Sequence, residues 1–299
     1  MKKKFLLILL LTFIPSSIFS MKINRVILSS NSNPFYLDFW PIVAKAWKRL
    51  GVKPTLALIC DGKIEIDESL GDIIKINPLP DIPIAFQATT IRLLLPAYFE
   101  DDICILSDID MLPLNKDFLL GSVAKVSDDK FVIYRDKYYH YKNITRYPMC
   151  YTAAKGKTFK EVFQIQDTKQ IPQITKYWYK LSLHAAEKVA ASIKDKKKAE
   201  VEKRFTLAWS DERIMVSFLN AWKDSNTRLV KLGFGYEKFI NRYYWGYDSK
   251  LLKEGFYYDA HLPRPYFDSK NKKIIDKLLK DANLEDLILP EKKSRDKNA

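Results

Sequence analysis

The segment DICILSDIDMLPL, residues 102–114, decides the fold of this chain. Its first half, residues 103–106, is a continuous apolar run, which is typical of a strand buried on both faces of a sheet. Two aspartates, Asp108 and Asp110, follow with one residue between them. Side chains alternate between the faces of a flat strand, so the chain must bend for both carboxylates to converge, and Pro113 indicates that it soon leaves the ladder. The segment therefore predicts a central strand that ends in a loop with two converging carboxylates.

Short apolar runs and helical patterns alternate on both sides of this segment. We expect strands at residues 25–29, 53–60, 73–76 and 131–134, and helices at residues 35–50 and 83–98. Gly51 follows the first of these helices, a common position for glycine at a helix end. The alternation predicts an α/β fold in which helices flank a mixed sheet.

A helical insertion is predicted in the second half of the chain, where residues 174–205 are rich in lysine and alanine. Apolar residues recur there at spacings of three and four, from Ile174 through Trp178 to Ile193, which predicts one amphipathic helix. We expect it to pack on the sheet domain, and a lid over the site is the alternative. One domain over residues 21–290 and a disordered tail over residues 291–299 complete the prediction.

The first residues of the chain, 1–20, have the layout of a secretory signal peptide, with a basic start and an apolar stretch. This stretch is short for a membrane span, so we expect a leader that is cleaved after Ser20 and an exported protein. Translation from Met21 is the alternative, and it would leave the protein in the cytoplasm. The 3 cysteines, an odd number, offer no disulfide framework, and we expect buried thiols.

The 299 residues carry a formal net charge of +14, from 50 basic and 36 acidic residues. Such a charge suits an anionic partner, for example a nucleotide diphosphate, a phospholipid surface or nucleic acid. We prefer dispersed surface lysine as the explanation, because acidic residues interrupt the densest basic runs. No nucleic-acid-binding motif is present, so we expect no nucleic acid partner, and nothing in the sequence indicates a membrane.

The 9 glycines form neither the glycine-rich turn of a dinucleotide site nor a phosphate-binding P-loop. A bound nucleotide would therefore need a metal ion and side chains to hold its phosphates. Carboxylates suit Mg²⁺ or Mn²⁺, and such an ion between Asp108 and Asp110 can also bridge a diphosphate. A solvated acidic turn is the alternative. Arg92 stands among apolar residues in the helix upstream, which favours a nearby anion or carboxylate because its charge cannot stay unpaired.

Three short segments resemble the retaining glycosyltransferases of family eight, which include glycogenin and bacterial lipooligosaccharide galactosyltransferases. Residues 92–96, RLLLP, resemble the family's Arg-Leu-x-x-Pro helix. Residues 105–110, ILSDID, resemble the strand that ends in its metal-binding Asp-x-Asp, or DxD, motif. Asp211 and Glu212 are similar to the family's Asp-Gln segment near the transferred sugar. Residues 87–114 carry the specific part of this resemblance.

The resemblance implies a GT-A-like domain that transfers a hexosyl group from a nucleotide-diphosphate sugar, of the UDP type, to a sugar or other hydroxyl acceptor, with retention of configuration. Asp108 and Asp110 would bind Mn²⁺ or Mg²⁺, and Asp211 and Glu212 would occupy the catalytic position near the sugar. The residues that would contact the nucleotide-sugar are Ser29, Asn31, Gln87, Arg92, Asp108 and Arg264.

The chain departs from the family pattern at two places. Glu212 replaces the usual glutamine, so a role that needs an amide is in question. The family's third metal ligand is a histidine followed by a glycine and a Lys-Pro-Trp group, whereas residues 259–266 read DAHLPRPY, with a shorter spacing and no glycine. His261 follows an expected strand at residues 255–258. We weigh a metal ligand, with Arg264 reaching a phosphate, against a structural histidine.

Two other hypotheses stay open at this point. A phosphohydrolase would use the paired aspartates as nucleophile and acid, but Met111 and the late position of the pair in the chain speak against it. An exported, non-enzymatic binding protein would tolerate Asp108→Asn and Asp110→Asn without loss of function. It would also show no metal-dependent affinity for nucleotides.

Overall fold

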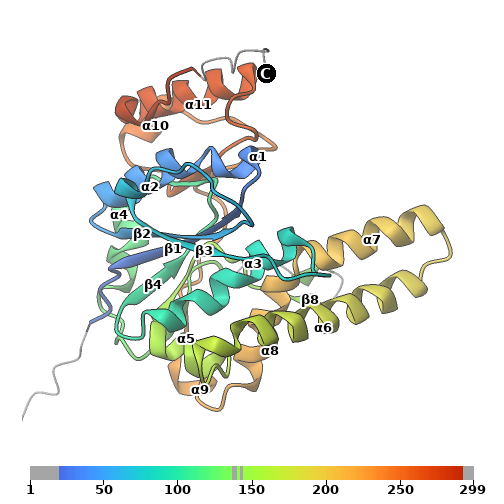
Figure 1. The fold of residues 1–299 in the computed structure, drawn as a ribbon. Coiled ribbons are helices and arrows are strands. Elements are labelled where there is room, and N and C mark those ends of the chain that lie inside the picture. The colour runs from blue at the N-terminus through green and yellow to red at the C-terminus, as the bar shows by residue number, and fades with distance from the viewer. Residues whose placement is uncertain (1–19, 137–139, 142–143, 292–299) are drawn as a thin grey trace, which may run out of the picture.

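The computed structural model describes residues 20–136, 140–141 and 144–291 (Figure 1). A seven-stranded sheet forms its centre, in the order β10-β6-β9-β4-β1-β2-β3. The strands are β1 (Arg25–Asn31), β2 (Lys53–Ile59), β3 (Asp72–Ile76), β4 (Ile103–Leu106), β6 (Phe131–Ile133), β9 (Thr152–Lys155) and β10 (Leu229–Lys231). Neighbouring strands run parallel, except that β9 is antiparallel to both β4 and β6. The predicted mixed sheet is confirmed.

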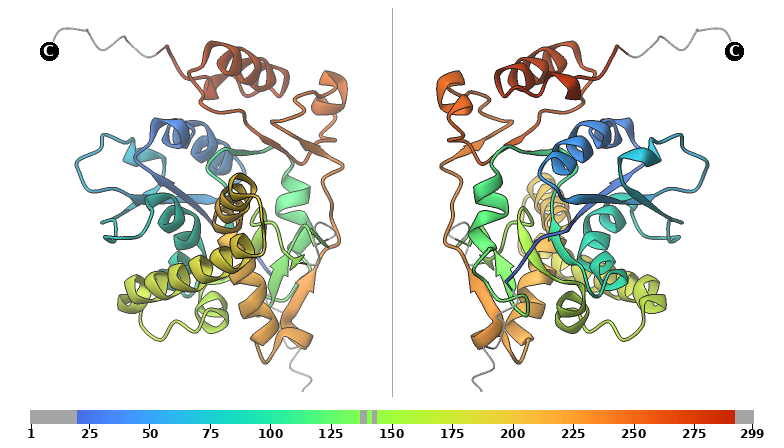
Figure 2. Two further views of the ribbon diagram at one scale, coloured as in Figure 1. Left: turned by 90° about the vertical axis from the view of Figure 1, so that its right-hand side faces the viewer. Right: turned by 90° about the vertical axis from the view of Figure 1, so that its left-hand side faces the viewer.

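Strand β1 shows how the sheet separates two cores. Val26 and Leu28 belong to one core and Ile27 to the other, as the two-residue period of a strand requires. The first core includes residues of α2 (Trp40–Arg49) and α11 (Ser269–Asp281). The second includes residues of α3 (Ile84–Leu94), α5 (Gly156–Val162) and α8 (Ser210–Ala221). The helices thus flank the sheet on both sides (Figure 1), and in both views of Figure 2 α11 lies at the end of the molecule beyond α2.

A second sheet of three strands carries the end of the acidic segment. Its order is β11 (Phe239–Ile240), β12 (Asp259–His261) and β5 (Met111–Pro113), with β5 antiparallel to β12. Pro113 thus leaves the large sheet, as predicted, but pairs at the edge of the second one, a position that proline tolerates. The strand predicted at residues 255–258 is wrong: β12 comes directly after them, because Asp259 and Ala260 are the fully buried residues of this segment.

Local chemistry explains the helix boundaries. The helix predicted over residues 35–50 is two helices, α1 (Pro34–Leu37) and α2, with Pro41 in the first turn of α2, where its missing N–H costs little. Gly51 has a φ of +81° and follows α2 as predicted. The helix predicted over residues 83–98 is α3 followed by a tighter 3₁₀ turn. Apart from the helices of the insertion, the remaining α-helices are α4 (Lys116–Leu119), α9 (Ser225–Arg228) and α10 (Ser249–Lys253). Strand β7 (His140–Tyr141) pairs antiparallel with β8 (Ile144–Thr145).

The predicted helical insertion is a hairpin of two helices rather than one helix. Helix α6 (Ile171–Ala191) and helix α7 (Lys196–Ala208) lie side by side and extend away from the sheet (Figure 1). Asp195 starts α7, because its side chain accepts a hydrogen bond from the backbone N–H of Lys198 at 3.0 Å. The apolar period that ends at Ile193 therefore covers α6 and the turn that follows it. The lysine-rich stretch after this turn begins a new helix.

Three other expectations concern the chain as a whole. Cys60, Cys104 and Cys150 are buried and unbridged, as predicted. The predicted leader, apart from Ser20, and the predicted tail from residue 292 onward lie outside the described residues. Within the part that the structure describes, no helix has both the length and the apolar character needed to cross a membrane.

Candidate functional site

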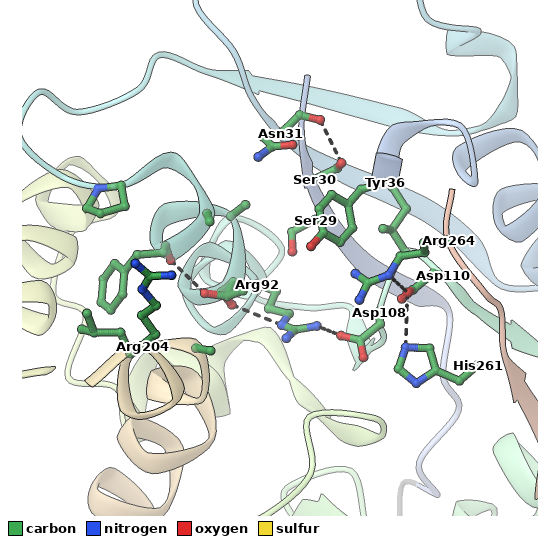
Figure 3. A pocket seen from close by; sticks show the side chains of 18 of the residues that line it. Ser29, Ser30, Asn31, Tyr36, Arg92, Asp108, Asp110, Arg204, His261 and Arg264 are labelled. Carbon is green, nitrogen blue, oxygen red and sulfur yellow. Dashed lines mark hydrogen bonds and ion pairs between the residues drawn. The ribbon is translucent and has the colours of Figure 1, made fainter. Parts of the chain in front are cut away.

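A cavity of about 530 Å³ opens where β1 and β4 end (Figure 3). Parallel neighbours bring their carboxyl ends to the same edge of a sheet, which is where α/β folds commonly bind ligands. The cavity is lined by residues 29–31 of β1, by residues 108–110 after β4, and by side chains of α3 and α7. The acidic segment thus meets the end of the first strand in one cavity.

The two aspartates converge because the chain turns back directly after β4. The backbone N–H of Met111 donates to the carbonyl oxygen of Asp108 at 3.1 Å, which closes the turn. Strand β5 then pairs with β12, so that His261 lies opposite Met111. The N–H of Leu262 donates to the carbonyl oxygen of Asp110 at 2.9 Å and ties the two segments together. The predicted bend after the central strand is confirmed.

Asp108, Asp110 and His261 form a cluster that can hold a metal ion. One oxygen or nitrogen atom of each side chain lies within 4.8 Å of those of the other two. Two carboxylates and an imidazole suit Mn²⁺ and similar divalent ions. Asp110 is buried, whereas Asp108 and His261 are partly exposed and all three line the cavity, so an ion held by them would keep a side open to a ligand. The residues present therefore fit a divalent metal ion.

Arg92 of α3 connects this cluster with a second acidic pair. Its Nη1 contacts Asp108, and its Nη2 lies 2.6 Å from Oδ2 of Asp211 (Figure 3 shows the contact with Asp108). Burial by itself raises the pKa of Asp108, but Arg92 and His261 together outweigh it and the pKa lies below its usual value. The expectation that Arg92 meets a carboxylate is confirmed, and it meets two.

Two arginines and a histidine surround Asp110. Its Oδ2 lies 2.7 Å from Nη1 of Arg242, 3.2 Å from Nε of Arg264 and 3.2 Å from Nε2 of His261. Burial raises the pKa of this carboxyl, yet His261 and the two arginines together hold it far below its usual range. Asp110 is therefore ionised under all ordinary conditions, as a carboxyl group must be to bind a metal ion.

A buried ion pair fixes β12, the strand that carries His261. The guanidinium of Arg135 donates to both carboxylate oxygens of Asp259, at 3.0 and 2.8 Å, and both side chains are fully buried. Arg135 also donates to the carbonyl oxygen of Cys150 at 3.3 Å. A two-pronged contact of this kind holds a strand in one register. It places His261, two residues after Asp259, at the cavity wall.

Asp211 and Glu212 lie in the first turn of α8, behind Arg92. Glu212 lies 3.4 Å from Arg146, whose guanidinium stacks on the ring of Trp209. Burial raises the pKa of Asp211 despite Arg92. Burial, with the neighbouring charge of Asp211, raises the pKa of Glu212 to about 8. This second pair therefore binds protons more tightly than ordinary carboxyls do.

Most of the residues predicted for the site come together in the cavity, and three do not line it. Those that line it are Ser29, Asn31, Arg92, Asp108, Asp110, His261 and Arg264. Asp211 is joined to it through Arg92, with Glu212 next in the chain. Gln87 is 2% exposed, and its amide bonds with the backbone of Leu79 and Ile82. Gln87 thus secures the loop before α3, and its prediction as a nucleotide contact is not met in this structure, because that side of α3 faces the protein.

Sequence reasoning missed several residues that line the cavity. Arg242 contacts Asp110 from a segment for which no role was predicted, and Tyr36 lies under Arg264 with the guanidinium 4.5 Å from its ring centre. Tyr179 of α6 and Arg204 of α7 extend the wall from the hairpin. No local signal marks Arg242, whereas the position of Tyr36 just after the polar end of β1 could have suggested it.

Comparisons with known sequences find no match: no protein-family model fits the chain, and no curated protein resembles it significantly in sequence.

Several solved structures resemble the chain in fold. The galactosyltransferase LgtC, solved with donor and acceptor sugar analogues, is 13% identical, with 87% of this chain and 95% of LgtC covered and a TM-score of 0.46. The glycosyltransferase GlyE of Streptococcus pneumoniae TIGR4 is 12% identical, with 91% of this chain and 66% of GlyE covered and a TM-score of 0.45. A glycosyltransferase involved in the glycosylation of the major capsid of PBCV-1 is 10% identical, with 85% and 98% covered and a TM-score of 0.37. All three solved proteins are described as glycosyltransferases.

Proposed function

We propose that this protein is a metal-dependent glycosyltransferase that moves a hexosyl group from a nucleotide-diphosphate sugar, of the UDP type, to a sugar or another hydroxyl acceptor. The observation that carries the proposal is the cluster of Asp108, Asp110 and His261 in the wall of a cavity large enough for such a donor. Two carboxylates and an imidazole, open on one side, are suited to a metal ion that shares its ligands with a diphosphate.

The charge balance of the cavity supports an anionic donor. Four arginines line it, against two carboxylates: Arg92, Arg204, Arg242 and Arg264 face Asp108 and Asp110. Asp211 pairs with Arg92 and Glu200 with Arg204, which offsets the charge of the lining, and a divalent ion would add an excess of two positive charges. A nucleoside diphosphate supplies the negative charge that such a site lacks. A neutral sugar alone would leave the excess uncompensated.

Different residues of the cavity are suited to different parts of a nucleotide-sugar donor. Ser29 and Asn31 offer polar groups at the end of β1 for the base or ribose. Arg264, held over the ring of Tyr36, is placed to meet a phosphate near Asp110. When bound, the divalent ion supplies Lewis-acid stabilisation of the departing diphosphate. Asp211, on the far side of Arg92, would lie near the transferred sugar, and retention of configuration is what the resemblance to family eight implies.

Calorimetric titration of the full-length protein with UDP tests this proposal. UDP binding is expected to require Mn²⁺, and Asp110→Asn, which keeps the shape but loses the anionic ligand, is expected to weaken it at least about 100-fold. Asp286→Asn, the same change at an exposed ion pair with Arg49, serves as the matched control and should leave binding unchanged. Absence of binding of UDP, GDP and ADP with every divalent metal would contradict the proposal. It would favour a non-enzymatic binding protein in which Asp108 and Asp110 have no functional role.

A further inference from the structure

Arg242 reaches the cavity from an irregular stretch that follows β11. Its Nη1 lies 2.7 Å from Oδ2 of Asp110, and its side chain is 15% exposed. The next two residues, Tyr243 and Tyr244, are 76% and 85% exposed. The backbone around Arg242 is therefore held by few buried contacts, in contrast to the strand that carries His261.

The hydrogen bonding of Arg242 is incomplete in this arrangement. Its Nε is buried and has no hydrogen-bond acceptor among the described residues. A buried N–H without an acceptor is unfavourable, because its hydration is lost and nothing replaces it. A guanidinium presents Nε and one Nη side by side, which matches two oxygens of a phosphate. The contact with Asp110 uses only part of this donor set.

Arg242 would also compete with a metal ion for the carboxylate of Asp110. A divalent cation coordinated by Asp110 would bring two positive charges next to the guanidinium, and in a site with little water this repulsion is strong. Arg264, the other arginine on Asp110, lies 4.5 Å above the ring of Tyr36, which stabilises it in place. Arg242 lies 5.2 Å from the ring of the exposed Tyr243. It is thus the arginine with less to hold it on Asp110.

We infer that Arg242 exchanges Asp110 for the diphosphate of the nucleotide, so that metal and diphosphate bind together and the metal binds only weakly by itself. The inference rests on the proposed function. In the arrangement seen here the guanidinium neutralises Asp110. With the ion present, the same guanidinium turns to the phosphate oxygens, which satisfy both its charge and its unpaired Nε. Arg242 is then a specificity residue for diphosphates over neutral nucleosides.

This exchange predicts two effects of opposite sign for one substitution. Arg242→Gln removes the competitor, so Mn²⁺ alone should bind about tenfold more tightly than to the wild type. The same variant should bind UDP in the presence of Mn²⁺ about tenfold more weakly, because one charge-assisted contact is lost. A merely structural arginine would weaken both or neither.

The experiment is calorimetric titration of the full chain with Mn²⁺ alone, and with UDP or uridine in the presence of Mn²⁺. Arg242→Lys keeps the charge and should restore wild-type affinity for Mn²⁺ alone. Arg49→Gln changes an arginine outside the cavity, in an exposed ion pair with Asp286, and should leave the affinity for Mn²⁺ alone within twofold of the wild type. Uridine should bind wild type and Arg242→Gln equally. Thermal unfolding confirms that each variant is folded.

The two levels of the proposal fail in different ways. Unchanged or weaker binding of Mn²⁺ alone to Arg242→Gln would overturn the exchange, and so would equal binding of UDP with Mn²⁺ to both proteins. Failure of the wild type to bind UDP with Mn²⁺ would instead overturn the proposed function, and the inference with it.

Discussion

The guanidinium of Arg92 connects the two acidic pairs of this molecule, Asp108 with Asp110 and Asp211 with Glu212. The pKa values of the two pairs' most buried members, Asp110 and Asp211, shift in opposite directions. Asp110 and Asp211 are equally inaccessible, with side chains 4% and 3% exposed. Yet the pKa of Asp110 lies far below its usual range, whereas that of Asp211 is raised. Depth of burial therefore cannot explain the difference.

The number of side chains that stabilise the charged form of each carboxyl explains the difference. Asp110 has Arg242, Arg264 and His261 on one oxygen, while Asp211 shares Arg92 with Asp108. Burial disfavours every charged carboxyl, and opposite charges and hydrogen bonds to the charged form reverse this effect. The first pair consequently stays ionised and available to a metal, and the second is biased toward keeping protons.

The raised pKa of Glu212 also bears on its departure from the family pattern. With a pKa of about 8, raised by burial and by Asp211, this carboxyl holds a proton at neutral pH. A protonated carboxyl both donates and accepts hydrogen bonds, as the amide of glutamine does. Glu212 can thus serve where glutamine is usual, provided that the pH stays below its pKa.

The largest effect on stability is expected from Asp211→Asn, which tests whether Asp211 is ionised in its contact with Arg92. If the contact with Arg92 is an ion pair, its removal should lower the free energy of unfolding by about 3 kcal/mol, since a buried pair is broken and Arg92 keeps only Asp108 as a charged partner. Urea unfolding at pH 7 measures this, with Asp286→Asn as an exposed control expected within about 0.5 kcal/mol of the wild type. A loss below about 1 kcal/mol would mean that Asp211 carries a proton and that the two pairs differ more than proposed.

An effect of intermediate size is expected from Glu212→Gln. Between about pH 4.5 and 8 the folded protein keeps a proton on Glu212 that the unfolded chain has lost, so the stability of the wild type falls as the pH rises. The variant lacks this contribution and should be more stable by about 2 kcal/mol above pH 8, with no difference near pH 4; 19% exposure of the side chain reduces the full value. Denaturant unfolding across this pH range measures the difference. Parallel pH profiles for the two proteins would contradict the raised pKa.

The smallest effect concerns the cation that partly offsets the burial of Glu212. Arg146→Met keeps apolar contact with Trp209 but removes the positive charge, so the pKa of Glu212 should rise further. The decline of stability with pH should then extend about one pH unit higher, as measured by the same unfolding series. The same change in the Glu212→Gln background is the control, and it should not move the profile. A shift that persists there would assign the effect to another group.

Local patterns were sufficient for the elements that meet at the site. The apolar run before Asp108 is β4 with the predicted bounds, and Arg92 contacts a carboxylate as its apolar neighbours in the sequence required. Gln87 shows where this reasoning fails, because its place five residues before Arg92 did not reveal which side of α3 faces the cavity. Arg242 is 132 residues from Asp110 in the chain, and no pattern around it indicates a partner.

The sequence by itself determined the α/β class, the central strand, the two converging aspartates and the arginine that meets them, because hydrophobic period, strand length and unpaired charge act between near neighbours. Only the tertiary structure decided that β12 brings His261 opposite Met111, that Arg242 and Arg264 share one oxygen of Asp110, and that the insertion is a hairpin. These features depend on which distant segments pack together. The opposite pKa shifts of the equally buried Asp110 and Asp211 have the same origin, since the balance between lost hydration and nearby charge is set by the folded arrangement alone.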